Sequence, residues 1–245
     1  MQPENLVYPP YDAPLVEAYG ARFESVFLIL HPFIRVPEEL SWRATGKYPA
    51  DEQILARGEK CSWAEVAAEA GIPTCSKLGQ ALLTSIGSVG EELSDYGSAR
   101  ALKGFLEAAP VWMPEEGRFE PLLRADFLAA FDAAGLDEMV FVPEFPGVDP
   151  VQRLQGSQLQ SGGQEFPARG TLAAPDGSFL FTVDWDSFFT LFYGPRDFVA
   201  SVARGRGLEG FFAEPTTEHH WFNYHLGCSV VTLAPDVWPA ESIVA

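Results

Sequence analysis

Basic side chains are scarce in this sequence. It holds 16 Lys and Arg residues against 34 Asp and Glu, which gives a formal net charge of −18 at pH 7. A surplus of this size repels nucleic-acid phosphates and anionic lipid headgroups unless the cations gather on one face. The densest basic run, Arg196, Arg204 and Arg206, is interrupted by Asp197. We therefore expect no nucleic-acid or membrane partner. The charge either attracts a basic protein or a cation, or only keeps the protein in solution.

Cysteine pairs and long apolar runs are also missing. Cys61, Cys75 and Cys228 are odd in number and widely spaced, and no Cys-x-x-Cys occurs. The sequence therefore predicts neither a disulfide framework nor a zinc knuckle. The longest apolar run, residues 26–30, is far below the ~20 residues of a membrane span. Residues 1–5 lack the basic and apolar parts of a signal peptide. We expect a cytoplasmic protein.

Familiar catalytic motifs are absent too. The sequence has no Gly-x-Ser-x-Gly and no Gly-x-x-x-x-Gly-Lys. It therefore predicts no hydrolase nucleophile elbow and no phosphate-binding loop. Apolar residues at 47% and charged residues at 20% lie in the range of globular proteins, so we expect an ordered core.

Helical signals lie mostly in the first half of the chain and strand signals mostly in the second. Caps, apolar stripes and glycine stops predict helices near residues 12–19, 62–71, 74–86, 98–108, 120–134 and 195–205. Apolar runs predict strands near residues 25–30, 139–142, 171–174, 179–183, 188–193, 210–213 and 228–233. Because the strands cluster and do not alternate with helices, we predict an α+β fold with a helical N-terminal half and an antiparallel-sheet-bearing C-terminal half.

Proline and glycine concentrate in one segment, residues 143–170. The concentration predicts a linker or long surface loop at 146–170. It would separate a mainly helical lobe with one or two strands, residues 1–145, from a sheet-bearing lobe, residues 171–245. One continuous domain is the alternative.

The predicted helix pair at residues 62–86 locally resembles a helix-turn-helix, in particular the helical hairpin of alkylguanine-DNA alkyltransferases. Ala67 and Gly71 have the spacing expected at the turn, but the Pro-Cys-His-Arg active-site run of that family is missing. The second helix offers only Lys77 and Gln80 as polar contacts to DNA. We therefore predict a structural helix pair.

Two carboxylates follow the predicted strand 179–183 in the sequence Asp184-Trp185-Asp186. If the strand continues, both project from one face, where they could share a cation or act as an acid and base pair. The motif resembles the metal-binding element of some nucleotide-sugar transferases. The alternative is a pair of ordinary surface carboxylates at the end of a strand.

Three of the four histidines lie close together, at His219, His220 and His225. Their spacing does not match His-x-His on a strand or His-x-x-x-His on a helix, the patterns that place two rings on one face. On a strand, His219 and His225 would lie roughly 20 Å apart. A divalent metal site would therefore need ligands from elsewhere in the chain, and the best candidates are Asp184 and Asp186, or His31. The alternative is a polar loop covered by aromatic rings.

Aromatic and acidic residues adjoin one another in the C-terminal half. Most of the aromatic residues are expected in the core. Those beside the carboxylates could form a patch for a basic partner, because aromatic side chains supply contact area and carboxylates speed encounter. The candidate binding residues are Asp184, Trp185, Asp186, Glu214, Glu218 and Trp221.

The stretch 184–212, with Phe-Phe-Thr-Leu-Phe-Tyr-Gly-Pro-Arg at 188–196 and Gly-Leu-Glu-Gly-Phe-Phe at 207–212, resembles an uncharacterised bacterial family of unknown function. This resemblance implies no activity. Two functions remain open. One is an acidic, immunity-protein-like binding protein for a basic protein. The other is a metal-dependent or small-molecule enzyme that uses Asp184, Asp186 and the 219–225 histidines.

Overall fold

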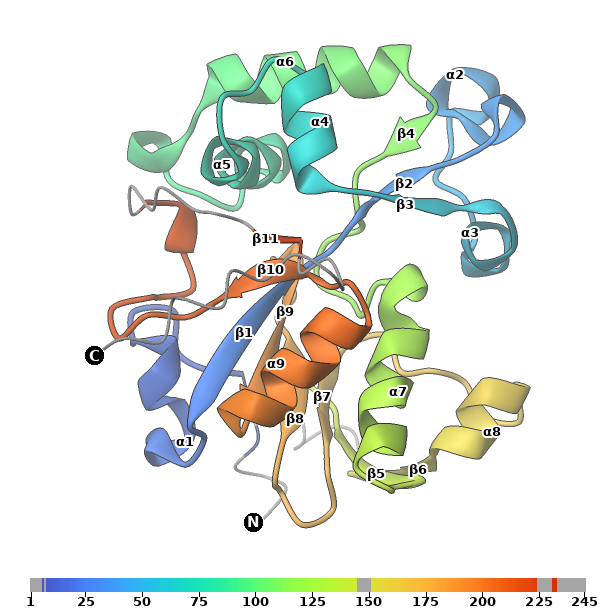
Figure 1. Cartoon of the computed structure of the whole chain (residues 1–245). Coiled ribbons are helices and arrows are strands. Elements are labelled where there is room, and N and C mark those ends of the chain that lie inside the picture. The colour runs from blue at the N-terminus through green and yellow to red at the C-terminus, as the bar shows by residue number, and fades with distance from the viewer. Residues whose placement is uncertain (1–5, 7, 145–150, 224–230, 233–245) are drawn as a thin grey trace.

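The computed structural model describes residues 6, 8–144, 151–223 and 231–232, and they form the predicted α+β fold (Figure 1). The described strands make one eight-stranded and one three-stranded sheet, both antiparallel. The order in the large sheet is β11 (Val231–Thr232), β10 (Glu209–Phe212), β1 (Ser25–Leu30), β9 (Phe189–Gly194), β8 (Leu180–Val183), β7 (Gly170–Ala173), β5 (Glu138–Val142) and β6 (Gln152–Gln155).

Strand β1 comes from the N-terminal half of the chain but lies inside the large sheet, between β10 and β9. All six of its residues are buried, as an uninterrupted apolar run predicts. Successive side chains point to opposite faces. Val26 and Leu28 therefore join the core on one face, while Phe27 and Ile29 join the core on the other.

Helices cover both faces of the large sheet. The core around Phe27 and Ile29 also contains side chains of α7 (Arg124–Ala133) and α9 (Arg196–Gly205). The opposite core contains side chains of α4 (Trp63–Glu69), α5 (Cys75–Ile86) and α6 (Tyr96–Ala108). Figure 1 shows α4, α5 and α6 as a separate layer, away from α7 and α9. No helix in the described part of the chain is long and apolar enough to cross a membrane.

The predicted helix pair at 62–86 is confirmed as α4 and α5. Ser62 and Glu65 form the predicted capping box, and Thr74 caps α5 by accepting a hydrogen bond from the Lys77 backbone at 3.1 Å. Glu209 from β10 accepts a hydrogen bond from the Trp63 backbone N–H at 2.8 Å, so the sheet also satisfies the first turn of α4. The Lys77 side chain is 3.3 Å from Asp95.

The small sheet has the order β3 (Glu59–Cys61), β2 (Phe33–Arg35) and β4 (Val111–Trp112). None of these short strands is among the predicted ones. Strands β2 and β4 and helix α3 (Asp51–Arg57) contribute to a third apolar cluster around Ile34, Leu40 and Ile54. Helix α2 (Trp42–Thr45) contacts this cluster through the Trp42 and Trp112 rings. The N-terminal prediction near 12–19 corresponds to a 3₁₀ turn, Leu15–Glu17, followed by α1 (Ala18–Ala21).

Regular structure also occurs within 146–170, the segment predicted as a linker or long loop. Strand β6 pairs with β5, and α8 (Gly156–Ser161) follows it directly. The Asp137 carboxylate accepts hydrogen bonds from the Ser157 backbone at 2.7 Å and its hydroxyl at 2.9 Å. The Asp137 carboxylate therefore satisfies a free N–H group in the first turn of α8 from a distant point in the sequence, which local propensity does not reveal. The division of the chain into lobes stays a prediction.

Candidate functional site

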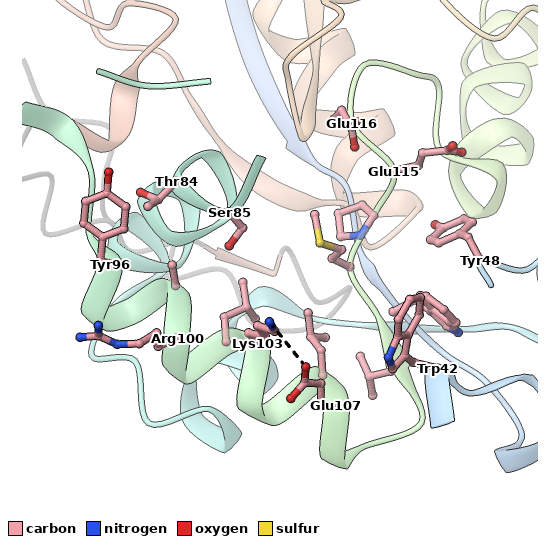
Figure 2. A pocket seen from close by; sticks show the side chains of 17 residues that line it. Trp42, Tyr48, Thr84, Ser85, Tyr96, Arg100, Lys103, Glu107, Glu115 and Glu116 are labelled. Carbon is pink, nitrogen blue, oxygen red and sulfur yellow. Dashed lines mark ion pairs between the residues drawn. The ribbon is translucent and has the colours of Figure 1, made fainter. Parts of the chain in front are cut away.

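A pocket of about 800 Å³ lies between α6, α2, strand β4 and the loop that follows β4. Its volume and largely apolar lining match those of small-molecule sites. Figure 2 shows the side chains that surround it. The main apolar and aromatic contributors are Trp42, Tyr48, Tyr96, Leu106, Trp112 and Met113.

The α6 wall is positioned by Asp95, whose side chain accepts a hydrogen bond from the Ser98 backbone at 3.0 Å and so begins the helix. Leu102 on this helix is 1% exposed and belongs to the core above the large sheet, yet it also borders the pocket. At the other end of α6, the Ala108 carbonyl accepts a hydrogen bond from Arg43. The pocket is therefore built between ordered elements that contact one another.

Aromatic rings form the opposite wall. Trp112 donates its indole N–H to the Leu40 carbonyl at 2.9 Å. Its ring meets Trp42 and Tyr48 edge-on, with centroid separations of 5.7 and 5.3 Å. Edge-to-face contacts hold rings in defined orientations. Trp42 remains 50% exposed, so an apolar ring is available at the mouth of the pocket.

A few polar groups interrupt the apolar lining. The Tyr48 hydroxyl is buried and has no hydrogen-bond partner in the described part of the chain. Glu115 binds Arg118 at 2.6 Å, and Lys103 lies 3.8 Å from Glu107. Small-molecule sites combine an apolar lining with a few such groups, which orient the ligand.

A buried carboxyl lies close to Tyr48. Glu120 is fully buried, and one of its oxygens accepts a hydrogen bond from the Leu122 backbone at 3.4 Å. Its other oxygen has no partner within the described residues. Burial raises the pKa of Glu120 to about 7, although Leu122, Arg118 and Arg124 oppose the rise. Burial, and then the charge of Glu120, also raises the pKa of Tyr48.

Of the residues predicted from sequence, the Asp184-Trp185-Asp186 turn lies beside the end of this pocket. The Gly117 backbone N–H donates to the Ser187 carbonyl at 2.9 Å. Burial, Asp184 and Glu116 raise the pKa of Asp186. Glu116 lines the pocket, so the acidic turn and the pocket share a charged edge. Within the turn, Asp184 is buried whereas Trp185 is 54% exposed.

Two tyrosines link Asp184 to the predicted histidines. Tyr11 donates its hydroxyl hydrogen bond to Asp184, and its ring stacks on His219 with centroids 4.2 Å apart. The Tyr8 hydroxyl lies 2.9 Å from His219 Nδ1. Neither tyrosine was singled out by the sequence patterns, since both lie in an extended lead-in more than 170 residues away, with separations of 173 and 211 residues along the chain.

The histidines occupy different surroundings. Burial lowers the pKa of His219 to about 3, and the charge of His220 adds to the effect. Burial lowers the pKa of His220 too, against the opposing charges of Glu218 and Asp184. Both side chains therefore remain neutral near pH 7. His31 is also buried, and its Nε2 lies 2.8 Å from the Thr190 hydroxyl.

The other predicted residues are dispersed. Trp221 is 1% exposed and packs its ring against Trp63 and Phe211 in the core. Glu214 is exposed and Glu218 half-buried, whereas His225 lies outside the described residues. Within the described residues, no three His, Cys, Asp or Glu side chains are grouped so that they could hold a metal ion. Metal binding by the 219–225 segment stays a prediction.

Comparison with known proteins identifies a family. The chain matches the model described as "Protein of unknown function (DUF2711)" over residues 11–223. A relative, "Uncharacterized protein YwbB" of Bacillus subtilis (strain 168), is 22% identical over 218 residues, which cover 86% of this chain and 96% of the relative. No solved structure matches the chain. The predicted resemblance to a bacterial family of unknown function is confirmed. Because the match covers most of the chain, including the pocket and the acidic turn, the chain belongs to the DUF2711 family.

Proposed function

We propose that this protein binds a small amphipathic molecule in the pocket between α6 and β4. The observation that supports the proposal is the cavity of about 800 Å³ itself, with aromatic rings on one wall and an apolar helix face on the other. Burial of a ligand's apolar body there stabilises a complex by roughly 25 cal/mol for each Å² removed from water. The polar groups at its rim orient the ligand.

A polarity-sensitive neutral dye, Nile red, tests the proposal. Ala99 on α6 lines the pocket, while Ala101 on the same helix is exposed and does not. Ala99→Phe should reduce dye binding by at least roughly fivefold, because the ring occupies space that the ligand needs. Ala101→Phe, the matched control, should bind the dye as the wild type does. Equal binding by both folded variants contradicts the proposal.

A second candidate is binding of a basic protein at the 184–186 turn, as the sequence suggested. The observation that favours it is the exposed Trp185 side chain, which stands between two carboxylates in the sequence Asp184-Trp185-Asp186. An oligoarginine peptide serves as the probe. Its affinity should fall steeply with added salt, and Trp185→Ala should weaken binding several-fold. Affinity that is unchanged by salt or by the substitution contradicts this candidate.

A further inference from the structure

We infer that the head group of the pocket's ligand is a protonated amine, bound at the end of the pocket formed by Tyr48, Glu115 and Glu116. This inference rests on the proposed function and specifies the ligand class. It is drawn from the charges at the two ends of the pocket and from one buried hydroxyl.

The Tyr48 end of the pocket has more negative than positive charge. Asp51 accepts hydrogen bonds from Arg118 and Arg124, and Glu115 accepts from Arg118. These contacts pair two carboxylates with two guanidinium groups. Glu116 is then left without an ion pair among the described residues, and it is half-buried on the pocket wall. A cation placed there gains an attraction that no protein group already satisfies.

A further carboxylate adds to this negative potential. Burial, Asp184 and then Glu116 raise the pKa of Asp186, so the Asp186 carboxylate lies near Glu116. Arg169 is the cation that faces Asp186, but it also binds Glu144 at 3.3 Å. The guanidinium groups near the pocket end are therefore shared among several carboxylates. A ligand carboxylate at this end would meet repulsion, whereas an ammonium group would not.

The Tyr48 hydroxyl supplies an independent observation. It lines the pocket, is buried, and has no hydrogen-bond partner in the described residues. A buried hydroxyl without a partner destabilises the folded protein, so its presence requires an explanation. An ammonium group has three N–H donors. In the proposed complex, one of them donates to the Tyr48 oxygen and another to the Glu116 carboxylate.

The opposite end of the pocket determines the orientation. Arg100 lies there, beside Tyr96 in Figure 2, and makes no ion pair with the described residues, whereas Lys103 is matched by Glu107 at 3.8 Å. Positive charge at that end repels an ammonium group. The apolar body of the ligand therefore extends beneath α6, and its amine points toward Glu116.

The test uses three ligands that share an indole body, tryptamine, tryptophol and indoleacetate, measured by titration calorimetry with the full chain at low salt. Tryptamine should bind roughly tenfold more tightly than tryptophol, the effect of one charge-assisted hydrogen bond. Indoleacetate should bind most weakly. Equal affinities for the amine and the alcohol overturn the inference, as does preferred binding of the acid.

Two glutamine substitutions provide a matched pair. Glu116→Gln should lower the affinity for tryptamine roughly tenfold and leave that for tryptophol unchanged. Glu107→Gln makes the same change on the α6 wall of the same pocket, at a carboxylate that is already paired with Lys103, and should preserve the preference for the amine. If both variants retain that preference, Glu116 does not bind the head group.

Tyr48→Phe separates a ligand contact from a structural role. Loss of the unpartnered hydroxyl should raise the thermal midpoint of the free protein while it weakens tryptamine binding several-fold. If the Tyr48 hydroxyl has only a structural role, the substitution changes the thermal midpoint and leaves tryptamine affinity unchanged. That result would show that Tyr48 does not contact the amine. If none of the three ligands binds, the inference fails, and the Nile red comparison still decides the proposed function.

Discussion

Replacement of Glu120 by Gln should change how stability depends on pH. The Glu120 carboxyl is fully buried, with a pKa of about 7 against an ordinary value of 4.5. The folded protein therefore holds a proton between these two pH values that the unfolded chain releases. Stability from this group is complete below about pH 4.5 and is lost as the pH rises through 7.

The expected magnitude follows from the same two pKa values. At about 1.4 kcal/mol for each pH unit, the ionised carboxyl destabilises the folded state by about 3 kcal/mol above pH 7. Glutamine resembles the protonated acid in shape and does not ionise. Because a little of this effect is already present at pH 5, the difference in unfolding free energy between Glu120→Gln and wild type should shift by about 2.5 kcal/mol in favour of the variant between pH 5 and pH 8.

Urea unfolding followed by tryptophan fluorescence at several pH values measures this difference. His31 and His219, with pKa values lowered to about 3, impose the opposite trend, because they favour the folded state above about pH 6.5 and lose that effect as the pH falls. Their contributions cancel when the variant is compared with wild type. Glu107→Gln serves as the control, because the Glu107 side chain is 55% exposed. Its unfolding free energy should differ from that of wild type by nearly the same amount at every pH. A constant difference for Glu120→Gln refutes the reasoning.

Three further substitutions test local contacts. Gly117→Ala should lower stability by about 3 kcal/mol or more, seen as a lower thermal midpoint, because φ is 66° and the new Cβ would lie 1.8 Å from the Trp185 carbonyl oxygen. A near-normal midpoint would show that the 117 and 185 segments separate easily. Tyr11→Phe should cost about 1 kcal/mol in urea unfolding by removing the hydrogen bond to buried Asp184; no loss would mean that this bond is absent in solution. Ser62→Ala should also cost about 1 kcal/mol, whereas Ser62→Thr should retain most of the capping stabilisation, since the hydroxyl caps α4.

Local sequence patterns predicted the longer elements well. Strand β1 was predicted from one apolar run, and α4 was predicted from Ser62 and Glu65, because the physical causes of these elements lie within a few residues. The short strands β2, β3 and β4 were not predicted. Segments of two or three residues, such as Val111–Trp112, have no detectable periodicity and are ordered by pairing with distant partners.

The candidate site was harder to predict for the same reason. Asp184 and Asp186 form a local pattern in the sequence, but the contacts of Tyr11 with Asp184 and of Tyr8 with His219 arise only through the tertiary fold. The pocket combines residues near 42–48, 84–85 and 96–116, and none of these segments contains a motif by itself. Only contacts between segments reveal that the Tyr48 hydroxyl and the Glu120 carboxyl are buried near each other.

The overall charge of −18 is a weak guide to binding because many carboxylates are matched where they matter most for stability. Asp126 is 4% exposed and contacts both Lys60 and Arg206, so it offers no free charge to a ligand. Removal of Lys60 or Arg206 would leave the buried Asp126 carboxylate with one cation fewer and would destabilise the folded protein. The charge that can act on a ligand is instead the one left unpaired at an accessible wall. Glu116 meets this condition within the described part of the chain, and for that reason its substitution, more than any change in net charge, should determine which head group the pocket accepts.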